Sequence, residues 1–134
     1  MKVDGSCFCG NLTFEAEVDP ATVILCHCAD CQILSSSAFR IVVPASEGSF
    51  RLLSGRPTVY VKTAESGNRR NLAFCSMCGT AIYSAPADGN SHYFGLRVGA
   101  LRQRRELIPH AQVWRRSALP WVDHIEQLAM HDAE

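Results

Sequence analysis

The chain has 134 residues, and its 13 Lys and Arg residues balance its 13 Asp and Glu residues, so its formal net charge is zero. This balance argues against attraction to nucleic acid or acidic membranes, and no apolar run approaches the roughly 20 residues of a membrane span. We expect residues 1–134 to form one domain, which at this length buries roughly two-thirds of the surface of the unfolded chain. No signal segment opens the sequence, so we expect a reducing compartment, the cytoplasm.

Alternation of apolar and polar side chains predicts the strands. Residues 12–18 alternate with period two, which predicts a half-buried strand that Asp19 and Pro20 end. A short apolar strand is expected over 23–25, and a turn or a single helical turn over 32–37. The other predicted strands are 39–43, 50–53, 58–62, 71–74, 80–84, 92–101 and 110–115.

One segment near the end of the chain has helical character. Val122, Ile125 and Leu128 recur at helical spacing, so we expect a helix over 121–130. A turn is expected at 88–90, where Asp, Gly and Asn follow one another. The sequence therefore predicts an all-β fold of antiparallel sheets with a short C-terminal helix.

The seven cysteines fall into three groups, and none is left over. An odd number cannot pair completely as disulfides within one chain, whereas seven divides into four plus three. Four thiolates close a tetrahedral zinc site, and three leave one position open for water or substrate. The groups are Cys7 with Cys9, then Cys26 with Cys28 and Cys31, then Cys75 with Cys78.

The spacing within each group lets its sulfurs meet. In an extended strand, residues two apart point to one face, so Cys7 and Cys9 can present both sulfurs together. Cys75 and Cys78 form a C-x-x-C knuckle, in which Gly79 supplies any positive φ that the turn needs. We therefore expect one zinc ion at the four cysteines of the two outer groups and a second at the three cysteines of the middle group.

Other interpretations of the cysteines remain open. One is a single zinc site accompanied by three ordinary buried thiols. Two further alternatives come from other functional classes: a non-catalytic zinc module that binds protein or nucleic acid, and a redox or zinc-storage protein whose trio Cys26, Cys28 and Cys31 is reactive. Metal content and thiol titration distinguish these alternatives from an enzyme.

Three segments around the cysteines resemble the glutathione-dependent formaldehyde-activating enzyme family, which also includes the CENP-V proteins. These segments are Gly5-Ser6-Cys7-Phe8-Cys9-Gly10, Cys26-His27-Cys28-Ala29-Asp30-Cys31 and Phe74-Cys75-Ser76-Met77-Cys78-Gly79-Thr80. Residues 98–101 and 109–121 look like later blocks of the family, so the resemblance covers nearly the whole chain. Gln32, Ser36 and Arg102 depart from it, since they stand where the family often has Arg, Gly and Asp.

The resemblance implies an Mss4-like fold, the β-tent, with two zinc ions per chain. The family's structural zinc would fall on Cys7, Cys9, Cys75 and Cys78, and its catalytic zinc on Cys26, Cys28 and Cys31. Glutathione with formaldehyde is the substrate pair that the resemblance suggests first. No nucleic-acid or membrane partner is expected.

Three thiolates on Zn²⁺ leave a net charge of −1, which suits thiol chemistry better than hydrolysis of an amide. An incoming thiol can take the fourth position, lose its proton and attack a carbon electrophile. We therefore expect a carbon–sulfur lyase or thiol-adduct synthase that acts on a small thiol such as glutathione. Asp30 is a candidate for orienting a ligand or carrying a proton, and His27 is expected to pack beside the ligands. Arg40, Arg69 and Arg70 are candidates for binding a carboxylate.

Overall fold

The computed structural model describes residues 1–89 and 92–134, and its strands form two sheets. The smaller sheet has the order β1-β2-β5, and the larger has the order β10-β3-β4-β9-β8-β7-β6. β10 pairs in parallel with β3, and the other neighbours are antiparallel. The strands are β1 (Lys2–Ser6), β2 (Thr13–Glu17), β3 (Ile24–Cys26), β4 (Arg40–Pro44), β5 (Arg51–Ser54), β6 (Thr58–Thr63), β7 (Arg69–Phe74), β8 (Ala81–Pro86), β9 (Gly95–Arg97) and β10 (Ala111–Val113).

Helical segments are few and short, so the prediction of a mostly β fold is confirmed. The α-helix α1 (Ala29–Ser35) lies between β3 and β4 and covers two turns, where a single turn was expected. The 3-10 helices are η1 (Pro20–Thr22), η2 (Val98–Ala100), η3 (Arg115–Ser117) and η4 (Pro120–Gln127).

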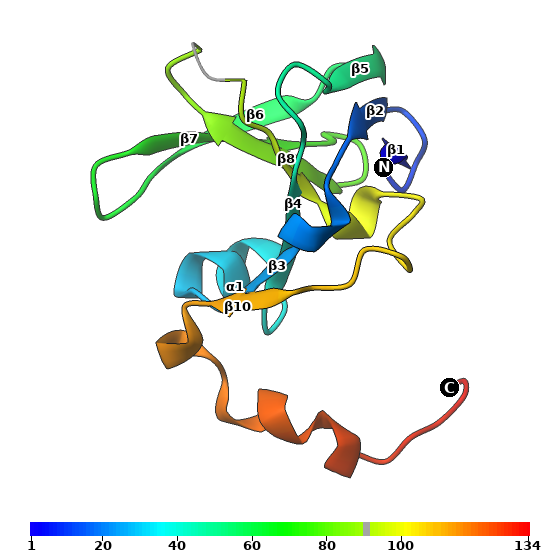
Figure 1. The fold of residues 1–134 in the computed structure, drawn as a ribbon, viewed down its shortest axis with the longest axis vertical. Helices are drawn as coiled ribbons and strands as arrows, with labels where there is room; N and C mark the ends of the chain where they lie inside the picture. The colour runs from blue at the N-terminus through cyan, green and yellow to red at the C-terminus, as the bar shows by residue number, and fades with distance from the viewer. Residues whose placement is uncertain (90–91) are drawn as a thin grey trace.

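The C-terminal helix is present, but it is a 3-10 helix that ends before residue 130. η4 is interrupted at His124, whose φ of −128° is not helical, and none of its residues is buried. Figure 1 shows the chain after β10 running away from the sheets. Because none of its side chains is fully buried, little packing stabilises the regular α-helix that the apolar spacing predicted.

Two further segments differ from the prediction. The strand expected over 92–101 is limited to Gly95–Arg97, and η2 follows it directly and brings Leu101 to a β-bridge with Gly5. β1 was not predicted, because its five residues include one buried aliphatic side chain, Val3, and a glycine. The turn expected at 88–90 is present at Asp88 and Gly89, whereas Asn90 lies outside the described residues.

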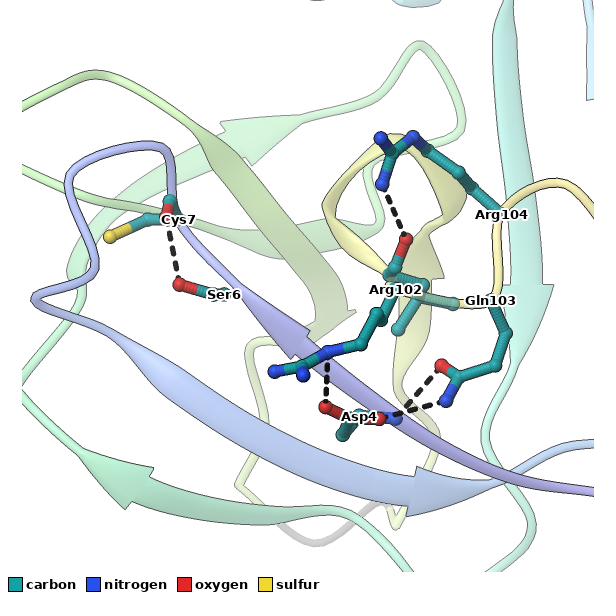
Figure 2. Close-up of polar contacts among 7 residues, drawn as sticks. Asp4, Ser6, Cys7, Arg102, Gln103 and Arg104 are labelled. Atoms are coloured by element: carbon teal, nitrogen blue, oxygen red, sulfur yellow. Dashed lines mark hydrogen bonds and ion pairs between the residues drawn. The ribbon is translucent and has the colours of Figure 1, made fainter.

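Polar contacts attach β1 to the loop that follows η2. The carboxylate of Asp4 accepts a hydrogen bond from Gln103 Nε2 at 2.7 Å and pairs with Arg102 Nε at 2.9 Å (Figure 2). The backbone N–H of Asp4 also donates to Gln103 Oε1. These contacts attach β1 to the loop after η2, in addition to the backbone pairing of β1 with β2. Arg102, which departs from the family pattern, therefore has a structural partner in Asp4.

The core contains residues from both sheets and from the cysteine turns. Phe50 stacks on Phe94 with ring centroids 4.6 Å apart, and Phe14 and Tyr83 contact Phe50 at 5.8 and 5.1 Å. These rings pack against buried side chains that come from η2 and the loops as well as from the strands. Two cysteines of the outer groups, Cys7 and Cys75, belong to the same core.

Candidate metal centres

The four outer cysteines come together at one point of the structure. Cys7 and Cys9 lie in the turn after β1, and Cys75 and Cys78 lie at the tip of the β7–β8 hairpin. Cys9 Sγ is 3.6 Å from Cys7 Sγ and 3.7 Å from Cys75 Sγ, and all four sulfurs lie within 4.8 Å of one another. We call these four cysteines the quartet, and their sulfurs lie close enough together to hold one metal ion.

A turn, and not a strand, brings the first two sulfurs together. Residues 8–10 form a turn in which the N–H of Gly10 donates to the carbonyl of Cys7, and Gly10 has a φ of +82°. The expectation of an extended Cys7–Cys9 segment is therefore wrong, because the two cysteines lie in a turn and not in a strand. The Leu12 N–H donates to Cys7 Sγ at 3.2 Å, as expected where a sulfur carries negative charge.

The second pair has the geometry that its sequence predicted. The N–H of Gly79 donates to the Cys75 carbonyl at 2.8 Å, and Gly79 adopts a φ of +79°. Thr80 then contacts the quartet, because its hydroxyl lies 3.2 Å from Cys78 Sγ and accepts a hydrogen bond from the Phe8 N–H. Thr80 therefore links the two turns that supply the sulfurs.

The thiols of the quartet differ in pKa. Hydrogen bonding, first by the Thr80 hydroxyl and then by its backbone N–H, lowers the pKa of Cys78 to about 5. For Cys9, the Asn11 backbone lowers the pKa, but the contact with Cys7 and desolvation outweigh it and raise the value to about 11. One sulfur is thus kept as a thiolate beside another that keeps its proton, and a bound cation would displace that proton.

The three middle cysteines form a second group at the junction of β3 and α1. Cys26 ends β3 and is buried, Cys28 precedes α1, and Cys31 lies in its first turn. Their sulfurs lie within 4.8 Å of one another. Within the described residues, the three cysteines form this group without a histidine or carboxylate as a fourth member. We call them the trio.

Cys28 has a structural role as the N-cap of α1. Its sulfur accepts a hydrogen bond from the Cys31 N–H at 3.3 Å. Burial would raise the pKa of Cys28, but this bond, the contact with Cys26 and the charge of Lys62 outweigh it and lower the pKa. Burial and the two neighbouring sulfurs raise the pKa of Cys31 to about 12. The trio therefore also combines a thiol of lowered pKa with a thiol of raised pKa.

His27 lies between two trio members, yet it is held away from them. Its ring is fully buried, its Nε2 lies 2.8 Å from Gln112 Oε1, and Phe39 packs against it edge-on at 5.9 Å. Its backbone N–H donates to the Val113 carbonyl. The expectation that His27 packs beside the ligands agrees with this position.

Asp30 is exposed and forms an ion pair with Lys62 Nζ at 2.6 Å. Its carboxylate therefore holds the ammonium group that lowers the pKa of Cys28. Gln32, one of the departures from the family pattern, donates from Nε2 to the carbonyls of His27 and Ser117 at 2.7 and 2.9 Å. Gln32 thus attaches α1 to η3.

The arginine candidates divide between two places. Arg40 is buried and stands directly opposite Cys26 in the β3–β4 register. Arg69 and Arg70 are the first two residues of β7, at the end of the strand opposite to Cys75, and Arg70 packs over the ring of Tyr93. Arg97, which stands opposite Val42 across β4 and β9, was not predicted from the sequence. A lone arginine in the otherwise apolar run 94–98 was the available signal.

This chain is similar to known proteins in sequence and in fold. The model of the glutathione-dependent formaldehyde-activating enzyme family matches residues 2–117. A Schizosaccharomyces pombe protein named as an uncharacterized lyase is 30% identical over 93 residues, which are 69% of this chain and 64% of that protein. A crystal structure of a Rhodobacter sphaeroides protein, 23% identical, has a TM-score of 0.63 and covers 81% of this chain and 98% of its own. That likeness supports the fold.

The match to the yeast protein leaves about a third of its length unmatched. The segment outside the family match, residues 118–134, includes η4 and the end of the chain that runs away from the sheets (Figure 1). Among the described residues, we find no helix with the length and apolar character needed to cross a membrane.

Proposed function

We propose that this chain, which belongs to the glutathione-dependent formaldehyde-activating enzyme family, is a zinc-dependent carbon–sulfur lyase. It would make or break a bond between a small thiol, such as glutathione, and a carbon that carries oxygen. The observation that supports this most is the trio, a three-sulfur donor set separate from the four-sulfur set. The name of the yeast relative, a lyase, points in the same direction.

Both donor sets fit zinc. Thiolates are soft ligands that zinc accepts in tetrahedral geometry, and a set of four is complete whereas a set of three leaves one position. We assign a structural zinc to Cys7, Cys9, Cys75 and Cys78 and a catalytic zinc to Cys26, Cys28 and Cys31. When bound at the trio, zinc supplies an acceptor for the sulfur of an incoming thiol and lowers the pKa of that thiol.

The surrounding residues prepare the trio for this role. Lys62, Arg40 and Arg97 place three positive charges around it, and positive neighbours favour the thiolate form of sulfur. Asp30 contributes by holding Lys62 in place. His27 fixes the backbone between two ligands through its contacts with β10, so the sulfurs keep their spacing.

Cobalt substitution and NMR test the proposal. We expect a small thiol added to cobalt-loaded protein to produce a thiolate-to-metal charge-transfer band, and the zinc protein to accelerate hemithioacetal formation from glutathione and formaldehyde. Cys28→Ser should lose both effects, whereas Ser76→Ala, in the quartet turn but not a ligand, should keep them. If no thiol perturbs the metal spectrum and no adduct forms faster than without protein, a non-catalytic binding module becomes the better account.

A further inference from the structure

A cavity beside the trio has no role yet. Its volume is about 360 Å³, within the range of small-molecule sites, and its wall is mostly apolar. Leu34 lines it one helical turn after Cys31, and Arg40 lines it from the position opposite Cys26. Residues three apart on a helix, and residues opposite each other in a sheet, are neighbours, so the trio adjoins two residues of the cavity wall, although none of the three cysteines lines the cavity itself.

Two guanidinium groups reach this cavity. Arg40 is only 7% exposed, and Arg97 has a buried Nε without a hydrogen-bond partner. Arg97 lies diagonally across the strand pair from Arg40, because it stands opposite Val42. Burial, followed by the charge of Arg40, lowers the pKa of Arg97 to about 10, while the sulfurs of Cys31 and Cys26 oppose this.

Holding two like charges in a largely dry site is costly unless anions compensate them. Among the ion pairs of the described residues, none involves Arg40 or Arg97. Zinc with three thiolates, as in the proposed function, carries a charge of −1 and compensates one of the two. While the sulfur of a bound thiol adduct carries no charge, one positive charge is left for an anionic group of that ligand.

The rest of the wall limits what that ligand can be. No described residue that lines the cavity is acidic, and apart from the two arginines its polar side chains are Tyr60 and Tyr83. An ammonium group would meet two cations and no carboxylate there. A ligand with one negative end and an apolar body fits both the charge and the wall.

From this arrangement we propose that Arg40 and Arg97 bind the carboxylate of the substrate, and that the preferred substrate is a thiol adduct in which an apolar chain joins the sulfur to a single carboxylate. The proposal rests on the proposed function for the position of the sulfur. Its anion-binding half depends only on the cavity. Arginine suits this role because its planar fork can bind both oxygens of a carboxylate.

The first experiment measures binding without a thiol, so it does not depend on the chemistry. Pentanoate and its uncharged analogue pentanamide are titrated into the full zinc-loaded chain and followed by NMR. We expect pentanoate to bind at least about tenfold more tightly, because hydrogen bonds between charged groups are roughly twice as strong as neutral ones. Equal binding of the two compounds would overturn the proposal without any variant being needed.

Variants then locate the binding. Arg97→Gln should remove the preference for pentanoate, whereas Arg97→Lys, which keeps the charge but loses the fork, should keep part of it. Arg69→Gln is the matched control, since Arg69 is an exposed arginine on β7 that does not line the cavity. Preference that persists in Arg97→Gln, or is lost equally in Arg69→Gln, contradicts the assignment.

The second experiment separates the cavity from the reaction. 5-Sulfanylpentanoate, 5-sulfanylpentan-1-ol and glutathione are compared as partners of formaldehyde by kcat/KM. We expect the carboxylate to exceed the alcohol at least about tenfold and to exceed glutathione. If pentanoate binds but no thiol reacts, the proposed function fails and the anion site stands. If thiols react without preference for the carboxylate, or glutathione reacts best, the substrate assignment fails and the proposed function stands.

Discussion

Replacing one cysteine in each group should have very different costs. Cys75 is 0% exposed and belongs to the core, whereas Cys28 is half-buried and lies outside it. The sulfur of Cys28 also caps α1. We therefore compare Cys75→Ser with Cys28→Ser, two identical chemical changes in different surroundings.

The expected magnitudes follow from those surroundings. In Cys75→Ser, a buried hydroxyl without a full set of partners costs about 1–3 kcal/mol. Weaker metal binding adds to this, since structural zinc contributes roughly 10–16 kcal/mol in zinc-finger peptides. The total should be several kcal/mol, a large part of a net stability of about 5–15 kcal/mol. In Cys28→Ser the cap survives, because serine is a preferred N-cap, so the cost should stay below about 1 kcal/mol.

Thermal melts with zinc present measure the difference. For a domain of this size, 1 kcal/mol shifts Tm by about 3–5 °C. We expect Cys28→Ser within about 5 °C of the parent, with one zinc lost, and Cys75→Ser to fall by more than about 10 °C. Cys28→Ala is the control for the cap and should cost about 1 kcal/mol more than Cys28→Ser. Equal destabilisation by Cys75→Ser and Cys28→Ser would refute the division into structural and catalytic sites.

Three further measurements follow from the structure. Elemental analysis should find two zinc ions per chain. A chelator should remove the zinc at the trio first, because three ligands and partial exposure allow faster exchange. A content of one zinc ion, or equal release rates, would contradict this. The pKa of Cys31 is raised to about 12, so this thiol is protonated near neutral pH. Zinc binding should therefore release protons, and zinc affinity should fall as pH falls. Calorimetry in buffers of different ionisation enthalpy measures the proton release. Gly5→Ala should cost about 1–3 kcal/mol in denaturant melts, because its Cβ would lie 2.2 Å from the Phe14 ring and 2.7 Å from the Ala100 carbonyl, whereas Gly99→Ala, with no heavy atom within 4 Å, should cost less.

The cysteine grouping could be predicted from the sequence because metal ligands are chemically specific. Sulfur donors must converge whatever path the backbone takes, so four plus three holds although Cys7 and Cys9 lie in a turn and not in a strand. Gly79 was equally informative, since a positive φ of +79° favours glycine. Local chemistry of this kind does not depend on distant partners.

Arg40 was a candidate from the sequence, but its pairing with Arg97 could not be predicted, because that pairing depends on strand register. Arg40 reaches the trio since it stands opposite Cys26, and Arg97 reaches it since it stands opposite Val42. Arg69 and Arg70 look like the same kind of residue in the sequence, but they lie on another part of the sheet. The regular helix expected near the C-terminus is absent for a related reason, since tertiary contacts bury none of the residues of η4.

The two proposed metal centres have the same donor atoms, but their surroundings differ. Cys7 and Cys75 are packed into the apolar core, and the contact that lowers the pKa of Cys78 comes from a neutral threonine hydroxyl. The trio is only partly buried and faces cations, two of which line a cavity large enough for a small ligand. A cation beside a closed four-sulfur site would serve no catalytic step, whereas beside an open three-sulfur site it stabilises an incoming thiolate and can bind its carboxylate. The placement of Arg40 and Arg97 next to the trio therefore supports, together with the ligand count, the proposal that the trio is the reactive centre.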